Sequence, residues 1–163
     1  MSTPAPVRLI DPRGQRFGAG LSALVLVAAT AFGLPIVAPL VALALGVSAG
    51  GGMRFFVFGR PWPVVRAALR MGPPATLEPE VPPRFAQALG ATALVAGTLA
   101  FLVAGGLGWL FVLAVAGLQG FLAVTGYCLG CRLYGLQWFV PGLFDRLVGN
   151  GSAIARTRLG RIG

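Results

Sequence analysis

Two long segments without any charged residue dominate this chain and exclude an ordinary soluble fold. The first extends from Phe17 to Gly52, and the second from Phe85 to Leu129. A helix rises about 1.5 Å per residue, so each segment is too long for one crossing of a hydrocarbon layer about 30 Å thick. Each segment is therefore predicted to fold back on itself as a helical hairpin. The composition agrees, because 56% of the 163 residues are hydrophobic and only 10% are charged.

Proline and glycine mark the predicted turn in each segment. Leu34-Pro35 interrupts the first, because proline lacks an amide donor and biases the preceding residue away from helical geometry. The sequence Gly-Gly-Leu-Gly at 105–108 is the predicted turn of the second. The sequence thus predicts an all-α integral membrane protein, a four-transmembrane-helix bundle made of two tight hairpins. The spans are expected at about residues 17–33, 36–53, 85–104 and 107–127.

All thirteen basic residues are arginines, and their positions predict the orientation of the bundle. Neither hairpin turn contains one, and positively charged loops stay on the cytoplasmic side of a membrane. Both termini are therefore expected in the cytosol. The expected division is a cytosolic segment 1–16, a membrane domain 17–149 with a cytosolic loop 54–84, and a basic tail 150–163 attracted to anionic headgroups.

Short polar segments outside the predicted spans show three local patterns. Asp11 followed by Pro12 is a typical helix start, so the first helix is expected to begin before its apolar part. Residues 61–71 are amphipathic and predict a short interfacial helix. Residues 72–83 contain five prolines, so we expect an exposed linker without regular structure there.

Both cysteines of the chain lie in one C-x-x-C motif at the end of the predicted fourth span. Cys128 and Cys131 can face each other on one helical turn, close enough for a disulfide. Arg132 follows directly, and a nearby cation favours the reactive thiolate. Tyr127 and Tyr134 are expected as hydrogen-bonding or membrane-interface residues beside the motif.

The state and role of the two cysteines remain open at this point. On the cytosolic side most thiols are kept reduced, so a dithiol or a transient disulfide is expected rather than a permanent bridge. The helix dipole assists a thiolate only if Gly126 breaks the fourth helix and the cysteines begin a new one. Simple packing at a helix end is the alternative. No metal site is expected, except a zinc ion bound by Cys128 and Cys131 of two protomers together.

Missing residue types exclude several other functions. The chain has no histidine, and the predicted spans carry no charged group at depth, which argues against ion-coupled transport or a proton relay. Gln119 is the most polar side chain well inside a span and is expected to hydrogen-bond to a neighbouring helix. We expect no cofactor and no nucleic-acid partner, since no aromatic platform accompanies the basic tail.

Two motifs resemble those of a known bacterial family. Asp11-Pro12-Arg13-Gly14-Gln15-Arg16-Phe17 and Tyr127-Cys128-Leu129-Gly130-Cys131-Arg132-Leu133-Tyr134 together resemble the membrane family called domain of unknown function 4395. The resemblance extends from about Asp11 to Asp145 and implies a multi-pass protein of the bacterial cytoplasmic membrane. Members of that family are often encoded near thioredoxin-like and thiosulfate sulfurtransferase proteins, which implies thiol or sulfur traffic.

The leading hypothesis is therefore a membrane thiol protein. Its cytosol-facing pair would exchange electrons or sulfane sulfur with a soluble thioredoxin-like or rhodanese-like partner. Cys128 is expected to attack, Cys131 to resolve the intermediate, and Arg132 to stabilise negative charge. The rival hypothesis is a non-enzymatic membrane scaffold or accessory subunit in which the cysteines only pack. The lipid bilayer is the other expected partner.

Overall fold

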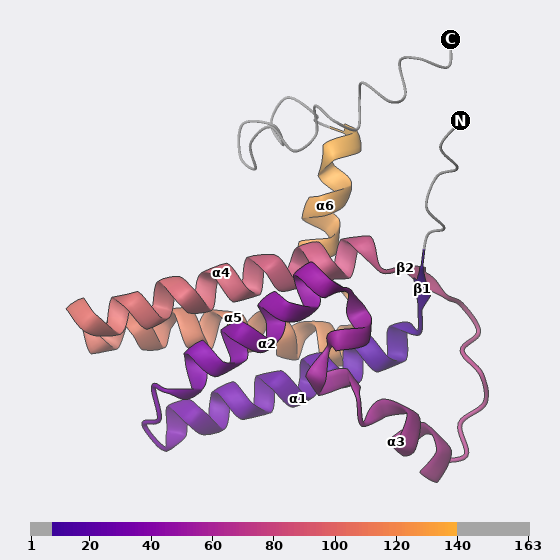
Figure 1. Ribbon diagram of the computed structural model, residues 1–163, viewed down its shortest axis with the longest axis horizontal. Helices are drawn as coiled ribbons and strands as arrows, with labels where there is room; N and C mark the ends of the chain where they lie inside the picture. The colour runs from indigo at the N-terminus through magenta and orange to yellow at the C-terminus, as the bar shows by residue number, and fades with distance from the viewer. Residues whose placement is uncertain (1–7, 140–163) are drawn as a thin grey trace.

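The computed structural model describes residues 8–139, and this part of the chain is mostly helical (Figure 1). One long helix lies at each of the four predicted positions, and the all-α class is confirmed. These helices are α1 (Pro12–Ala31), α2 (Val37–Gly51), α4 (Val81–Val103) and α5 (Gly105–Thr125). The short helix α3 (Trp62–Ala68) lies between α2 and α4, and α6 (Leu129–Phe139) leaves the bundle at a steep angle after α5 (Figure 1). The predicted basic tail 150–163 lies outside the described residues.

The turn between α1 and α2 lies where it was predicted, but glycine ends the helix before proline is reached. Gly33 adopts φ 64°, and its N–H donates to the carbonyl of Thr30 at 3.2 Å. The N–H of Leu34 donates to the carbonyl of Ala29 at 2.8 Å. This pair of bonds is the Schellman arrangement, which satisfies carbonyls at a helix end and favours glycine in the left-handed position.

The predicted glycine turn at 105–108 is wrong. The chain reverses at Ala104, which has an extended backbone, and α5 begins at Gly105. Gly108 therefore lies inside α5, and a Cβ atom there would collide with the ring of Phe101 on α4. This glycine serves close packing between two helices rather than a turn. The other end of the hairpin also differs, because α4 begins at Val81 with prolines in its first turn, where their missing N–H groups leave no intrahelical bond unmade.

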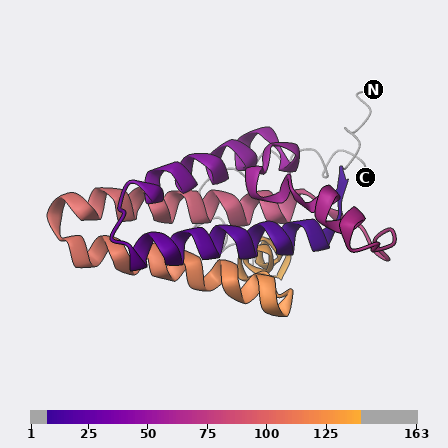
Figure 2. The same ribbon diagram turned by 90° about the horizontal axis from the view of Figure 1, so that it is seen from below.

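The bundle has an uneven pattern of contacts (Figure 2). α4 packs against both α2 and α5, and α5 packs in turn against α1. α1 and α2 have far less contact with each other, so the first hairpin is open rather than tight as predicted. Four fully buried apolar side chains, one from each long helix, mark the centre of the bundle. These are Leu26, Leu45, Leu94 and Val112.

Two helices of the described part are long and apolar enough to cross a membrane, α4 and α5, while α2 is equally apolar but has fifteen residues. Large apolar side chains on these helices point away from the bundle. Leu102 and Val103 at the end of α4 are 83% and 88% exposed, and Val124 on α5 is 81% exposed. Exposed apolar side chains of this size are typical of surfaces that contact lipid or another protein, because soluble proteins rarely expose large contiguous apolar areas.

The segment between α2 and α4 is more ordered than the predicted loop. Two short 3-10 turns, Met53–Phe55 and Val57–Gly59, precede α3. Beyond α3, strand β2 (Glu78–Pro79) pairs antiparallel with β1 (Leu9–Ile10), so the predicted irregular linker 72–83 is wrong at this point. A helix, α3, is present within the predicted segment 61–71, although it is shorter than the amphipathic pattern; its location at a membrane interface stays a prediction.

Asp11 joins the start of α1 to α3. Its carboxylate accepts the N–H of Arg13 at 2.9 Å, which confirms the predicted helix cap. The same side chain accepts the indole N–H of Trp62 at 3.0 Å and lies 3.9 Å from the guanidinium of Arg66. Arg84 donates from the start of α4 to the carbonyls of Ala49 and Gly50 at 2.9 and 2.7 Å. The segments that carry the arginines of the described part are the described residues up to the start of α1, the segment between α2 and α4, the start of α4, and α6. They lie toward the end of the bundle opposite both hairpin turns (Figure 1).

Candidate thiol site

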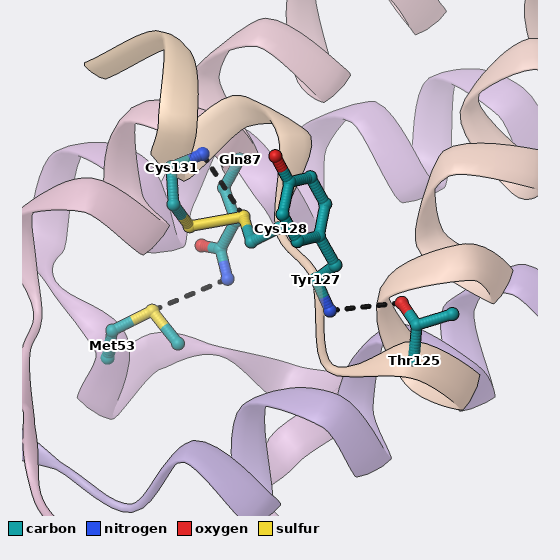
Figure 3. The surroundings of a disulfide bond; sticks show 6 residues. All are labelled: Met53, Gln87, Thr125, Tyr127, Cys128 and Cys131. Atoms are coloured by element: carbon teal, nitrogen blue, oxygen red, sulfur yellow. Dashed lines mark hydrogen bonds between the residues drawn. A yellow bond between two sulfur atoms is a disulfide. The ribbon is translucent and has the colours of Figure 1, made fainter. Parts of the chain in front are cut away.

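A sharp break between α5 and α6 sets the position of the two cysteines. Gly126 ends α5 in the left-handed conformation with φ 74°, and its N–H donates to the carbonyl of Leu122 at 2.8 Å. The hydroxyl of Thr125 accepts the N–H of Tyr127 at 3.0 Å, which turns the chain away from α5 (Figure 3). Left-handed geometry costs other residues about 1–2 kcal/mol, so glycine is the residue suited to this position.

Cys128 lies at the beginning of a new helix, which answers the question left open by the sequence. Its carbonyl accepts the N–H of Arg132 at 3.1 Å, the first helical bond of α6. Its Sγ accepts the N–H of Cys131 at 3.2 Å (Figure 3). Cys128 therefore occupies the N-cap position, where side-chain acceptors satisfy free N–H groups and negative charge is favoured.

Cys128 and Cys131 are joined by a disulfide in the structure (Figure 3). Their Cα atoms are 5.2 Å apart, within the usual range for such a bridge. Both residues are half-buried. The predicted pairing geometry is therefore present, on the first turn of α6 rather than at the end of the preceding helix.

Gly130, the second of the two residues between the cysteines, lies where α6 packs against α4. A Cβ atom on Gly130 would lie 2.6 Å from the Cβ of Ala86. Helix α6 consequently packs its first turn directly on α4, and only glycine fits at this contact. The composition of the C-L-G-C motif thus reflects helix packing as well as sulfur chemistry.

Two arginines flank the disulfide, and the sequence pointed to only one of them. Arg16, one turn into α1, donates to the carbonyls of Ala123 and Val124 at 3.0–3.3 Å and so caps the end of α5. With Arg132 and both cysteines it lines a pocket of about 310 Å³ at the polar end of the bundle. The carboxylate-bearing Glu78 lines the same pocket. No local signal marks Arg16 as part of this site, because it lies more than one hundred residues away in sequence.

The predicted aromatic neighbours pack instead of hydrogen-bonding. The guanidinium of Arg132 lies 5.0 Å above the centre of the Tyr127 ring, a cation–π contact. The Tyr134 ring lies 5.6 Å from that of Phe85 on α4. Neither tyrosine hydroxyl has a hydrogen-bond partner among the side chains that the structure describes, and the alternative role of these tyrosines at the membrane interface stays a prediction.

Buried amides lie beside the disulfide on the bundle side, and the sequence analysis missed most of them. Gln87 on α4 is 7% exposed, and its side-chain carbonyl accepts a hydrogen bond from the hydroxyl of Ser48 on α2. Its amide donates to the Sδ of Met53 at 3.4 Å (Figure 3). Gln119 makes no side-chain hydrogen bond to the described residues, so its predicted link to a neighbouring helix is wrong. Gln119 lines a second, apolar pocket together with Gln87 and Cys128.

The described residues contain no cluster of three or more histidine, cysteine, aspartate or glutamate side chains suited to a metal ion. Cys128 and Cys131 offer two sulfur atoms, half of a tetrahedral zinc shell. A zinc site shared between two protomers stays an untested alternative. The arrangement is a disulfide at a helix N-terminus, in a pocket that two arginines also line.

Comparison with protein families places this arrangement in context. A family model described as a domain of unknown function, DUF4395, matches residues 10–138. The chain belongs to the DUF4395 family. The match includes every residue of the thiol site described above, from Arg16 to Tyr134, as the sequence resemblance predicted. No curated protein and no solved structure matches this DUF4395 chain.

Proposed function

We propose that this chain is a four-span protein of the bacterial cytoplasmic membrane that exchanges electrons or sulfane sulfur through Cys128 and Cys131. The soluble partner is a thioredoxin-like or rhodanese-like protein of the cytosol. The observation that carries the proposal is the disulfide at the N-terminus of α6, with the Sγ of Cys128 accepting a backbone N–H.

The apolar surface and the arginine distribution support the membrane topology. α4 and α5 are long and apolar enough to cross a membrane. The shorter α2 is preceded by an apolar turn in which Phe32 and Ile36 are 77% and 65% exposed. The arginines of the described part lie at the other end. The positive-inside rule then assigns that end, with the disulfide and both termini, to the cytosol.

The exchange proceeds through a mixed disulfide. In the reduced protein, the Cys128 thiolate attacks a sulfur atom of the oxidised partner, forms a new S–S bond and releases one partner thiolate. The Cys131 thiolate then attacks the Sγ of Cys128, closes the internal disulfide and releases the second partner thiolate. Two electrons pass from this protein to the partner, and the reverse sequence returns them.

Sulfane sulfur follows the same path. Attack of Cys128 on a partner persulfide moves the terminal sulfur atom to Cys128 and leaves the partner as a thiolate. Attack of Cys131 on the Sγ of Cys128 then closes the disulfide and, with one proton, releases hydrosulfide. The positive charges of Arg16 and Arg132, which line the same pocket as both cysteines, favour the anionic sulfur species in each step.

Trapping of the intermediate tests this proposal. In membranes from cells expressing C131S, a mixed disulfide at Cys128 should accumulate, be lost on reduction, and contain the active-site cysteine of a thioredoxin-like or rhodanese-like protein. C128S is the matched control and should accumulate far less, because its remaining thiol is not the attacking one.

Two results would contradict the proposal. The first is labelling of the reduced cysteines by an impermeant maleimide from outside intact cells only. The second is a thiol pair that neither purified thioredoxin nor glutathione converts between dithiol and disulfide, which would favour the scaffold hypothesis.

A further inference from the structure

The disulfide lies between two pockets of different character. Both cysteines line the polar pocket that also contains Arg16 and Arg132. Cys128 alone also lines an apolar pocket of about 250 Å³ bounded by α1, α4, α5 and α6. The pair therefore has one side toward the proposed cytosolic partner and one sulfur atom toward the interior of the bundle.

Two amides in the apolar pocket lack a protein partner. Gln15 on α1 is 8% exposed and lines both this pocket and the polar one, and its side chain makes no hydrogen bond to the described residues. Gln119 on α5 lines it as well and is likewise without one. No completely buried side-chain N or O atom of the described part lacks a hydrogen-bond partner. The unpaired atoms of these two amides are therefore still accessible. Amides inside proteins are usually hydrogen-bonded, so a ligand with hydrogen-bonding oxygens would give these two the partners that the protein does not supply.

The pocket opens toward the surface that the proposed topology places in lipid. Three of its leucines are about half exposed: Leu118 on α5 at 52%, and Leu129 and Leu133 on α6 at 48% and 45%. The pocket walls are largely apolar side chains. In the proposed topology, a ligand that enters here comes from the bilayer and meets the amides within the pocket.

We infer that this pocket binds a lipid-soluble quinone, which accepts the electron pair of the Cys128–Cys131 dithiol. A quinone combines the required properties: an apolar ring, two carbonyl acceptors for amide N–H donors, and a tail that remains in the lipid. This inference rests on the proposed thiol exchange and names its second redox partner. The quinone acts as a diffusible substrate, in keeping with the expectation that the protein holds no resident cofactor.

Oxidation of the dithiol by the quinone needs no further reagent. The Cys128 thiolate adds to a ring carbon of the quinone. The Cys131 thiolate then attacks the Sγ of Cys128, forming the S–S bond while the C–S bond breaks and leaves its electron pair on the ring. The two thiol protons end on the two quinone oxygens. One dithiol becomes one disulfide, and one quinone becomes one quinol.

The position of the cysteines agrees with this order of events. Only Cys128 lines the apolar pocket, so it is the sulfur that meets the ring. Cys131 lies on the polar side and reaches the Sγ of Cys128 directly, as their disulfide shows. A reduced soluble partner could then restore the dithiol from the polar pocket while the quinol leaves through the lipid.

Quinone reduction by the full chain in lipid nanodiscs tests the inference. The protein is reduced with dithiothreitol, desalted without oxygen and mixed with decylubiquinone. Quinol formation is followed by absorbance and the thiols by maleimide gel shift, with C128S/C131S as the baseline. Wild type should yield one quinol per disulfide formed. Q119L, which removes an amide, and A93F, which fills the pocket, should slow the reaction by about tenfold or more.

The control L113F changes an exposed leucine of α5 that does not line the pocket, and it should remain within about twofold of wild type. Oxidation by glutathione disulfide should be unchanged in all three variants, which shows that the thiols and the fold are intact. If glutathione disulfide oxidises wild type but decylubiquinone does not, the quinone inference is overturned and the proposed thiol exchange stands. If neither oxidises it, both fail.

Two further outcomes would also overturn the inference. The first is equal quinone reduction by wild type, Q119L and A93F, which places the reaction elsewhere. The second is a phospholipid in the pocket that excess decylubiquinone does not displace, seen by native mass spectrometry of the wild-type protein. Wild-type measurements alone therefore decide the matter if a pocket variant fails to fold.

Discussion

Gly130 lies so close to Ala86 that a Cβ atom built on it would be 2.6 Å from the Ala86 Cβ. This contact joins the first turn of α6 to α4 between the two cysteines of the motif. The position of Cys131 relative to the bundle therefore depends on the absence of a side chain at residue 130. The contact couples the geometry of the thiol pair to the packing of the helices.

The substitution G130A should destabilise the protein by about 1–3 kcal/mol, because the added methyl group forces α6 away from α4. Thermal unfolding in detergent measures this loss. G135A is the matched control, since Gly135 lies on the same helix and a Cβ there meets nothing within 4 Å. In an open helical position alanine is favoured over glycine by about 0.5–1 kcal/mol, so G135A should be neutral or slightly stabilising. Equal effects of the two substitutions would show that the close approach is not present in solution.

Removing the guanidinium of Arg16 should loosen the end of α5 and the start of the thiol loop. The carbonyls of Ala123 and Val124 lose their donors in R16Q, and we expect a loss of about 1 kcal/mol of stability because the site is exposed. Cysteine reduction by dithiothreitol should also change rate, since Arg16 lines the same pocket as the disulfide.

R13Q provides the comparison for R16Q. Arg13 lies one turn earlier on α1, and among the described residues its guanidinium donates only to the carbonyl of Gly72, at an exposed position and a distance of 3.4 Å. Its replacement should change both stability and reduction rate little. An R16Q protein that behaves like R13Q would remove Arg16 from the thiol site.

Most of the long helices could be predicted because hydropathy and helix-breaking residues such as proline and glycine act locally. A charge-free run too long for one span has to turn, and Pro35 marked the first turn to within two residues of Gly33. The second turn was predicted in the wrong place because glycine is favoured both in turns and where two helices approach closely. Gly108 permits a close approach to Phe101 rather than a reversal of the chain, and only the facing helix distinguishes these roles.

The thiol pair could be predicted from its spacing, but its surroundings could not. Cys128 and Cys131 are neighbours in sequence, whereas Arg16 reaches them only after α1 has packed against α5. Gln15 and Gln87 look unremarkable in sequence, because glutamine is common at helix starts and surfaces. Their burial depends on packing between segments that are distant in sequence, such as that of α4 against α2, which no local pattern encodes.

Ser48 and Gln87 form a buried link between α2 and α4, and its energetics should be strongly non-additive. S48A leaves the Gln87 carbonyl without its donor and should cost about 1–3 kcal/mol. Replacing both polar groups, in S48A/Q87L, removes the unmatched partner and should recover much of that loss. A double-mutant cycle of thermal or denaturant unfolding measures the coupling. Additive losses would indicate that the hydroxyl and the amide do not bond in solution.

Side-specific labelling should separate the two ends of the bundle. In a C128S/C131S background, F32C introduces a thiol at the turn between α1 and α2, where Phe32 is 77% exposed, and R70C introduces one beyond α3 in the segment between α2 and α4. With the arginine-rich end in the cytosol, an impermeant maleimide should label residue 32 in intact cells and residue 70 only in inverted vesicles. A permeant maleimide should label both in either preparation, which controls for reactivity. Labelling of both positions from one side would contradict a crossing by α2, and reversed labelling would place the disulfide outside the cell, away from the proposed partner.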